Sequence, residues 1–271
     1  MAKVPYNQNG TKDLPEYWRE ATKSVGYDST GSGGPTDFKV SGGAYRTFVN
    51  DMTGEAVIAY KGSDFRGSDI FGIRDWIDDL NPFSMGAKTY DTVSNATRDT
   101  IKYLEANNID RSDIYTVGHS LGGALAQSAA LQFGLSGYGF DSLPISKTLL
   151  SRFEAWSTPD ELISNYRQNH TFIETNTGGD IATTLYSNVL GRSYLDANPT
   201  TLNSGVTNRD VFALVTLGMV GGWAPAALEG LGIGFMNHMT DSYSKYMNEP
   251  AQPAVSSPNW TYSHGKLAYA Y

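Results

Sequence analysis

The stretch that most constrains the fold of this chain is residues 114–126, which reads IYTVGHSLGGALA. β-favouring residues lead into Gly-x-Ser-x-Gly, and small and apolar helix formers follow, so the pattern predicts a strand, a sharp turn and a helix. Ser120 lies at the turn, where Gly118 and Gly122 let the strand and the helix approach closely. The motif alone is weak evidence because the chain contains 29 glycines. The elements expected on both sides, with Gly134 ending the helix, make it specific.

A serine in this position is a candidate nucleophile. The turn sets Ser120 at the beginning of a helix, where unpaired N–H groups and the helix dipole favour an oxyanion. The main-chain N–H of Leu121 is the expected first donor of an oxyanion hole. A serine also needs a base within hydrogen-bond reach and a carboxylate that orients the base.

The chain has four histidines that could supply the base. His119 lies inside the turn motif and cannot fold back onto the hydroxyl of its neighbour. His170 precedes a candidate strand, whereas catalytic side chains of parallel sheets follow strands. His238 and His264 remain as candidates.

The carboxylate is less well defined by position alone. Asp180 follows a strand expected at residues 171–175 and stands behind two glycines. An aspartate in a loop more often serves as a turn or capping residue. The competing positions are Asp141, Asp160, Asp196 and Asp210.

The surrounding pattern alternates strands and helices. Residues 38–49 and 55–61 predict a hairpin, residues 89–107 predict a helix, and residues 138–140 predict the strand after the serine helix. This order predicts an α/β fold with a mostly parallel central sheet and helices on both faces. We expect one domain over residues 1–271, with a short helix at residues 14–23.

Three motifs give the chain a resemblance to a known family. Residues 59–63 read AYKGS, residues 75–80 read DWIDDL and residues 118–123 read GHSLGG. In this order they resemble the class 3 lipase family, and the similarity covers roughly residues 38–135. The resemblance implies an α/β-hydrolase fold and the cleavage of carboxylic esters of acylglycerols or phospholipids.

The resemblance also implies roles for individual residues. Ser120 matches the nucleophile of the family. Ser63 matches the second oxyanion-hole residue, and Ser68 is the alternative because a similar FRGS follows at residues 65–68. Asp180, in the sequence NTGGDI, resembles the family's acid, and the interval to the base fits His238 better than His264. The family's small-Pro-Arg segment is missing, so no substrate preference is implied.

Composition excludes several other kinds of function. The formal net charge of −8 argues against binding to nucleic acid. The chain contains no cysteine, which excludes disulfides, a thiol nucleophile and cysteine-ligated metals. Asp75, Asp78 and Asp79 match no calcium-loop spacing. We therefore expect no cofactor and no metal.

Residues 211–236 form the most apolar run of the chain, interrupted by glycines, Pro225 and Glu229. The length would allow a membrane span, but these interruptions favour a lid over the site or a buried helical hairpin. A lid would bring transient contact with a membrane or lipid surface. The first residues lack an apolar signal region, so we expect a cytoplasmic protein or export by a signal-independent route.

Taken together, the sequence predicts a serine hydrolase that acts on lipid esters, a lipase, with Ser120, His238 and Asp180 as a triad and an acyl-enzyme intermediate. One alternative is a phospholipase A or an exported lipid-degrading effector with the same triad. An alternative of another class is an inactive hydrolase fold that serves as a binding module.

Overall fold

The computed structural model describes residues 14–21, 45–62, 87–153, 158–180 and 195–202, together with two short strands, 260–263 and 266–269. The chain separates into two compact units. The first contains residues 1–175 and 186–200, and the second contains residues 176–185 and 201–271. The single domain expected from the sequence stays a prediction.

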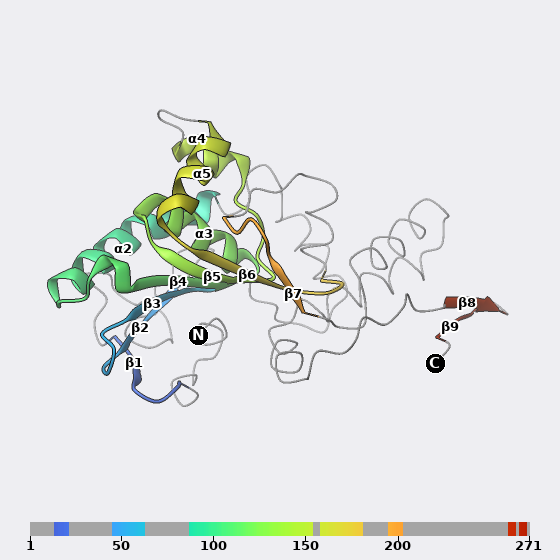
Figure 1. Ribbon diagram of the computed structural model, residues 1–271, viewed down its shortest axis with the longest axis horizontal. Helices are drawn as coiled ribbons and strands as arrows, with labels where there is room; N and C mark the ends of the chain where they lie inside the picture. Colours follow the sequence, from blue (N-terminus) through green and yellow to red (C-terminus); the bar gives the residue numbers. More distant parts are fainter. Residues whose placement is uncertain are drawn as a thin grey trace. The chain divides into compact units, whose positions relative to one another are not determined.

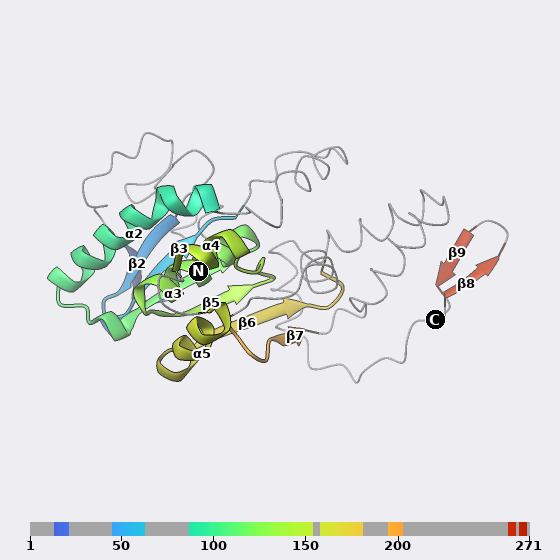
Figure 2. The same cartoon turned by 90° about the horizontal axis from the view of Figure 1, so that it is seen from above.

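The centre of the structure is a seven-stranded mixed sheet whose strands follow one another in sequence order (Figures 1 and 2). The first three strands are antiparallel, and the strands from β3 to β6 are parallel. A separate antiparallel pair consists of β8 and β9. The strands are β1 Trp18–Glu20, β2 Tyr45–Asn50, β3 Ala56–Tyr60, β4 Ile114–His119, β5 Ser136–Phe140, β6 Phe172–Thr177, β7 Thr200–Leu202, β8 Trp260–Ser263 and β9 Lys266–Tyr269.

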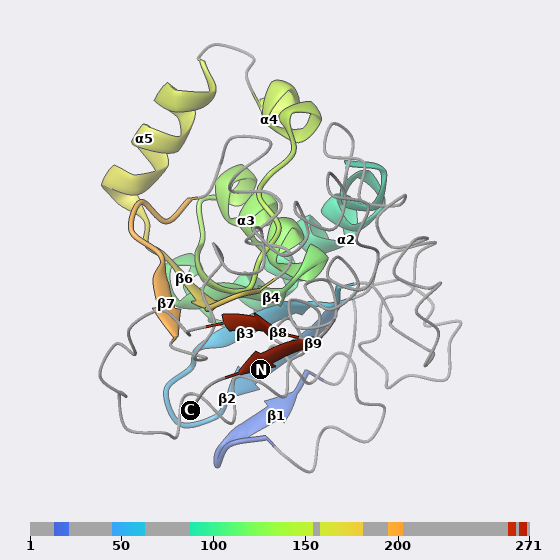
Figure 3. The same ribbon diagram turned by 90° about the vertical axis from the view of Figure 1, so that its right-hand side faces the viewer.

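In the described part of the chain, four α-helices lie between the parallel strands, and all four cover one face of the sheet (Figures 1 and 3). Because the strand order never reverses, right-handed crossovers place each connecting helix on the same side. The predicted α/β class and mostly parallel sheet are therefore confirmed. The sequence also predicted helices on both faces, whereas the described helices lie on one face. The helices are α2 Ala87–Ala106, α3 Leu121–Phe133, α4 Lys147–Phe153 and α5 Pro159–Asn169, with a 3₁₀ turn, η3, at Arg111–Asp113.

The alternation of side chains along each strand divides the core in two. In β3, Ala56, Ile58 and Tyr60 join the cluster formed with the helices. Their neighbours Val57 and Ala59 face the opposite side, where they form a smaller cluster with residues of β2 and β4. Both faces of β3 are buried, as the continuous apolar run in its sequence predicts.

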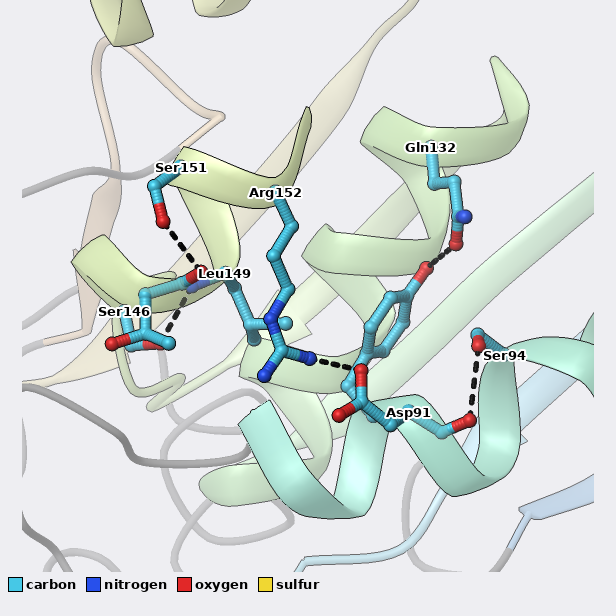
Figure 4. Close-up of polar contacts among 9 residues, drawn as sticks. Asp91, Ser94, Gln132, Ser146, Leu149, Ser151 and Arg152 are labelled. Carbon is cyan, nitrogen blue, oxygen red and sulfur yellow. Dashed lines mark hydrogen bonds and ion pairs between the residues drawn. The ribbon is translucent and has the colours of Figure 1, made fainter. Parts of the chain in front are cut away.

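The interface between α2, α3 and α4 combines apolar packing with polar contacts (Figure 4). Arg152 of α4 forms an ion pair with Asp91 of α2. The buried Tyr90 of α2 donates its hydroxyl proton to Gln132 of α3 and packs edge-on against Phe153. These contacts fix the helix layer that carries the serine turn.

The beginning of the described chain corrects one prediction. We expected a helix at residues 14–23, but Trp18–Glu20 form β1, which pairs antiparallel with β2. Tyr17 has a positive φ of 69°, which no helical residue adopts. The carboxylate of Glu20 also accepts two hydrogen bonds from the guanidinium group of the buried Arg46 in β2, at 2.8 and 2.6 Å. Long-range pairing therefore overrides the local helix pattern.

Candidate active site

Ser120 occupies the sharp turn between β4 and α3, as the sequence predicted. Its backbone has φ 59° and ψ −128°, a combination that costs free energy for any residue with a Cβ. The residue is 4% exposed. Such strain persists only where the surrounding structure enforces it, and it concentrates at functional sites.

Two glycines are required by close contacts at this turn. A Cβ on Gly118 would lie 2.1 Å from the carbonyl oxygen of Gly122. A Cβ on Gly122 would lie 2.4 Å from the carbonyl oxygen of Tyr60, at the end of β3. The spacing Gly-x-Ser-x-Gly is therefore a packing requirement between β3, β4 and α3.

The peptide groups of Ser120 are bonded on both sides to the end of β5 and to the residues that follow it. The Ser120 N–H donates to the carbonyl of Phe140 at 3.2 Å. The Ser120 carbonyl accepts from Leu143 N–H at 3.1 Å and from Gly123 N–H at 2.9 Å. The end of β5 and the start of α3 therefore hold the strained serine in place.

Leu121, the first predicted oxyanion donor, belongs to this turn. Leu121 is the first residue of α3, so its N–H has no helical acceptor four residues earlier. The chain leaving β3 also reaches the turn, because Gly62 N lies 2.9 Å from the position of a Cβ on Gly122. Ser63 is the next residue in the sequence, and Ser63 and its alternative Ser68 both lie outside the described residues.

Tyr60 fixes the point where β3 ends and this segment begins. Its side chain is fully buried, and its hydroxyl shares a hydrogen bond of 2.7 Å with Thr97 of α2. Burial raises the pKa of the Tyr60 hydroxyl well above its ordinary value, so the group is neutral at physiological pH. The neutral hydroxyl thus bonds the end of β3 to α2.

Asp180 belongs to the second unit and is buried. It follows β6 after a turn in which Gly179 has a φ of 71°. Its own N–H donates to the Thr177 carbonyl at 3.1 Å, and Gly178 N–H donates to Leu202 at 2.9 Å. In the structure, Asp180 therefore follows a strand and two glycines, as the sequence predicts.

The structure brings Ser120 and Leu121 together in one turn. His238, its alternative His264 and the apolar residues 211–236 lie outside the described residues. The catalytic roles assigned to Ser120, Leu121, Asp180, Ser63 and His238 stay predictions.

The competing aspartates have other surroundings. Asp141 is buried directly after β5, with a φ of 43°. Asp160 lies in the first turn of α5, next to a capping box formed by Thr158 and Glu161. Asp196 accepts the N–H of Glu174 at 2.8 Å. Asp210 lies outside the described residues.

Sequence reasoning missed the buried carboxylate of Glu174 in β6. Its side chain accepts the N–H of Ser142, in the segment bonded to Ser120, at 2.8 Å. The available signal was a charged residue between Ile173 and Thr175 in a predicted strand, since such a residue is rarely fully buried without a specific partner.

A hollow of about 290 Å³ lies near the amino ends of β3 and β4, whereas the serine turn lies at the carboxyl end of β4. It is lined by the turn between β2 and β3 and by the end of α2, including Arg19, Asn50 and Tyr103. Ligands of parallel sheets bind at the carboxyl ends of strands, whereas this hollow faces the amino ends of β3 and β4. It is therefore no candidate for the catalytic site.

Among the residues that the structure describes, no group of His, Asp or Glu side chains is arranged to hold a metal ion. Within the same part of the chain, no helix is both long enough and apolar enough to cross a membrane.

A strained serine between a parallel β-strand and a helix, at the carboxyl edge of a mostly parallel sheet, defines an α/β-hydrolase. More narrowly, the chain belongs to the phospholipase-like family of Tle-like phospholipase domains, whose model matches residues 1–190. This membership confirms the resemblance to lipid-ester hydrolases noted in the motifs around Ser120. No curated protein sequence matches the chain.

Several solved structures are similar at low identity. A mutant form of MDLA from Penicillium cyclopium is 18% identical over 62% of each chain, with a TM-score of 0.41. Lipase II from Rhizopus niveus is 14% identical over 67% of this chain and 69% of its own, with a TM-score of 0.43. The lipase from Rhizopus microsporus var. chinensis is 14% identical over 67% of this chain and 63% of its own, with a TM-score of 0.46. The chain thus spans less than two thirds of the Penicillium protein.

Proposed function

We propose that this domain hydrolyses carboxylic esters of phospholipids, with Ser120 as the nucleophile. The observation that carries the proposal is the backbone of Ser120, which is strained, buried and bonded on both sides. A turn residue without a chemical role has no reason to keep a conformation that costs about 1–3 kcal/mol. The membership in a phospholipase-like family supports the choice of a phospholipid over other esters.

The reaction follows the serine-triad scheme. His238 takes the proton of the Ser120 hydroxyl as its oxygen attacks the ester carbonyl, and Asp180 keeps the imidazole in the required tautomer. The N–H groups of Leu121 and Ser63 stabilise the oxyanion of the tetrahedral intermediate. His238 then protonates the leaving alcohol, which departs and leaves an acyl group on Ser120. Water attacks this acyl-enzyme in the same way and releases the fatty acid.

The test is product analysis on defined lipids. The protein is incubated with vesicles of phosphatidylcholine and phosphatidylethanolamine, and in parallel with a triacylglycerol emulsion of the same acyl chains. We expect fatty acid and lysophospholipid from the vesicles, at a higher rate than fatty acid from the emulsion. Faster hydrolysis of the triacylglycerol would make the domain a lipase, and release of a phosphorylated head group would contradict carboxylic-ester hydrolysis, because it comes from cleavage of the phosphodiester.

Labelling with a serine-directed fluorophosphonate identifies the nucleophile. We expect one adduct, on the peptide that contains Ser120, and none in Ser120→Ala. A folded protein that neither takes the label nor hydrolyses any lipid would be the inactive binding module considered in the sequence analysis.

We further propose that residues 211–236 act as a lid that contacts lipid when open. The run contains too many large apolar side chains for one buried stripe, and leaving them in water would expose an unusually large patch. The rate on a short-chain ester should then rise sharply above its solubility limit, and Trp223→Ser should reduce this rise more than the rate on the dissolved ester. Smooth saturation through the solubility limit would rule out the lid.

A further inference from the structure

The group that no motif explains is the carboxylate of Glu174, in the middle of β6. The side chain is fully buried, and its Oε1 accepts the N–H of Ser142 at 2.8 Å. Burying a carboxylate is costly unless its hydrogen bonds are made. A fully buried Glu in a sheet strand therefore calls for a specific reason.

The Ser142 N–H is one of three consecutive amides that are each bonded to a defined acceptor. Asp141 N–H donates to the Thr175 carbonyl of β6 at 3.0 Å, and Leu143 N–H donates to the Ser120 carbonyl at 3.1 Å. The Glu174 carboxylate holds the amide between them. The segment after β5 is thus fastened to β6 on one side and to the nucleophile on the other.

Packing between the same elements leaves little freedom to rearrange. A Cβ on Gly139 would lie 1.8 Å from Oε2 of Glu174, so the carboxylate lies directly against the backbone of β5. A Cβ on Gly123, in the first turn of α3, would lie 2.0 Å from Oγ of Ser142. Ser142 is therefore enclosed between the carboxylate of β6 and the helix that begins at the nucleophile.

We propose that Glu174 is a positioning residue for Ser120, acting through Ser142 and Leu143. The carboxylate is the acceptor that fixes Ser142 in the segment after β5. Leu143 of this segment donates to the Ser120 carbonyl, and Phe140, the last residue of β5, accepts the Ser120 N–H. The inference rests on the proposed function only for its effect on catalysis. The effect on the backbone of the serine turn can be measured without any enzymatic activity.

The first experiment measures kinetics per active site in Glu174→Ala and Glu174→Gln. Active sites are titrated with the fluorophosphonate, and hydrolysis of a soluble nitrophenyl ester is followed. We expect kcat per titrated site to fall about 10- to 100-fold in Glu174→Ala, with little change in KM, because small displacements of a reacting group are costly. Glu174→Gln keeps an acceptor oxygen and should retain kcat within about threefold.

Tyr166→Phe is the matched control. It removes another buried hydrogen bond, from the Tyr166 hydroxyl to the Leu135 carbonyl at 2.7 Å, which does not involve the serine turn. We expect a lower stability and an unchanged kcat per site. If Glu174→Ala behaves like this control, or if Glu174→Gln is as impaired as Glu174→Ala, the proposed role is wrong.

The second experiment is hydrogen exchange of peptides covering residues 118–123 and 140–146. Both should exchange faster in Glu174→Ala than in the wild type, and neither should change in Tyr166→Phe. Gly139→Ala, which forces the carboxylate away, should reproduce the effect if Glu174→Ala does not fold. Unchanged exchange in these variants overturns the positioning role. Faster exchange in a protein without hydrolytic activity would instead mean that the proposed function has failed and the positioning role has not.

Discussion

The two ends of the parallel strands, called here the carboxyl edge and the amino edge of the sheet, are built in different ways. At the carboxyl edge, Ser120 is buried and strained, and its peptide groups are bonded to β5 and α3. At the amino edge, the turn after β2 borders an open hollow, and the ion pair between Arg19 and Asp51 joins side chains that are 50% and 54% exposed. The hollow is an empty space at the surface, whereas the serine turn is fixed by close packing and hydrogen bonds.

The comparison shows which kind of feature identifies a reactive site in this fold. The hollow at the amino edge is lined in part by Asn108, whose φ of 64° lies in the left-handed region that asparagine tolerates. Ser120 combines its positive φ with a ψ of −128° and is fixed by several specific bonds, so its free-energy cost must be balanced elsewhere. The chemistry of the chain should therefore depend on the carboxyl edge alone, and substitutions at the two edges can test this.

The largest expected effect is that of Ser120→Ala. Removing the proposed nucleophile should lower kcat on a soluble nitrophenyl ester by a factor on the order of 10⁴ or more, as in serine triads. Circular dichroism should show an unchanged fold, since only one oxygen is lost. Activity close to that of the wild type in a folded Ser120→Ala protein would show that the reaction does not depend on the serine turn at the carboxyl edge.

The next effect concerns the base and the acid. His238→Ala should reduce kcat about as strongly as Ser120→Ala, because the two groups act as a unit, whereas His264→Ala should keep most of the activity. Asp180→Asn should have a smaller effect than either loss, because this carboxylate orients the base and does not react. Kinetics of the three variants on one ester decide the assignment, and the opposite result for the two histidines would make His264 the base.

A pair of glycine substitutions compares the two edges directly. Gly122→Ala places a Cβ 2.4 Å from a main-chain carbonyl and should lower the free energy of unfolding by more than about 3 kcal/mol. Gly54→Ala, in the turn at the amino edge, meets nothing within 4 Å and pays only for its φ of 77°, about 1–2 kcal/mol. Urea unfolding measures both. Equal losses would show that the carboxyl edge is no more tightly packed than the other.

The smallest effect is expected at the hollow itself. Arg19→Ala removes an exposed ion pair and should change the free energy of unfolding by less than about 0.5 kcal/mol. The kcat and KM for ester hydrolysis should not change. A clear loss of activity in Arg19→Ala would mean that the amino edge takes part in the reaction.

The features that were predicted correctly are those encoded within short stretches of sequence. The turn at Ser120 lies within a single run of residues, and β3 lies within the strand expected at residues 55–61. Asp180 follows a strand and two glycines in the structure, and its role as the acid stays a prediction. In each case neighbouring residues specify the local structure.

The features that were missed depend on partners far along the chain. β1 forms because Trp18 pairs with Asn50, and no pattern within residues 14–23 contains that information. Glu174 bonds to an amide 32 residues earlier. Side chains that act through such distant contacts can be recognised only once the sheet is known.

The strands of the sheet also lie side by side in the order in which they occur in the chain. During synthesis, which proceeds from the N-terminus, each new strand from β2 to β6 can therefore join the edge left by the previous one, and none has to insert between earlier strands. The serine turn is complete in the chain before β6 emerges. Because β6 carries Glu174, we expect the nucleophile to reach its final geometry only when this last parallel strand is added.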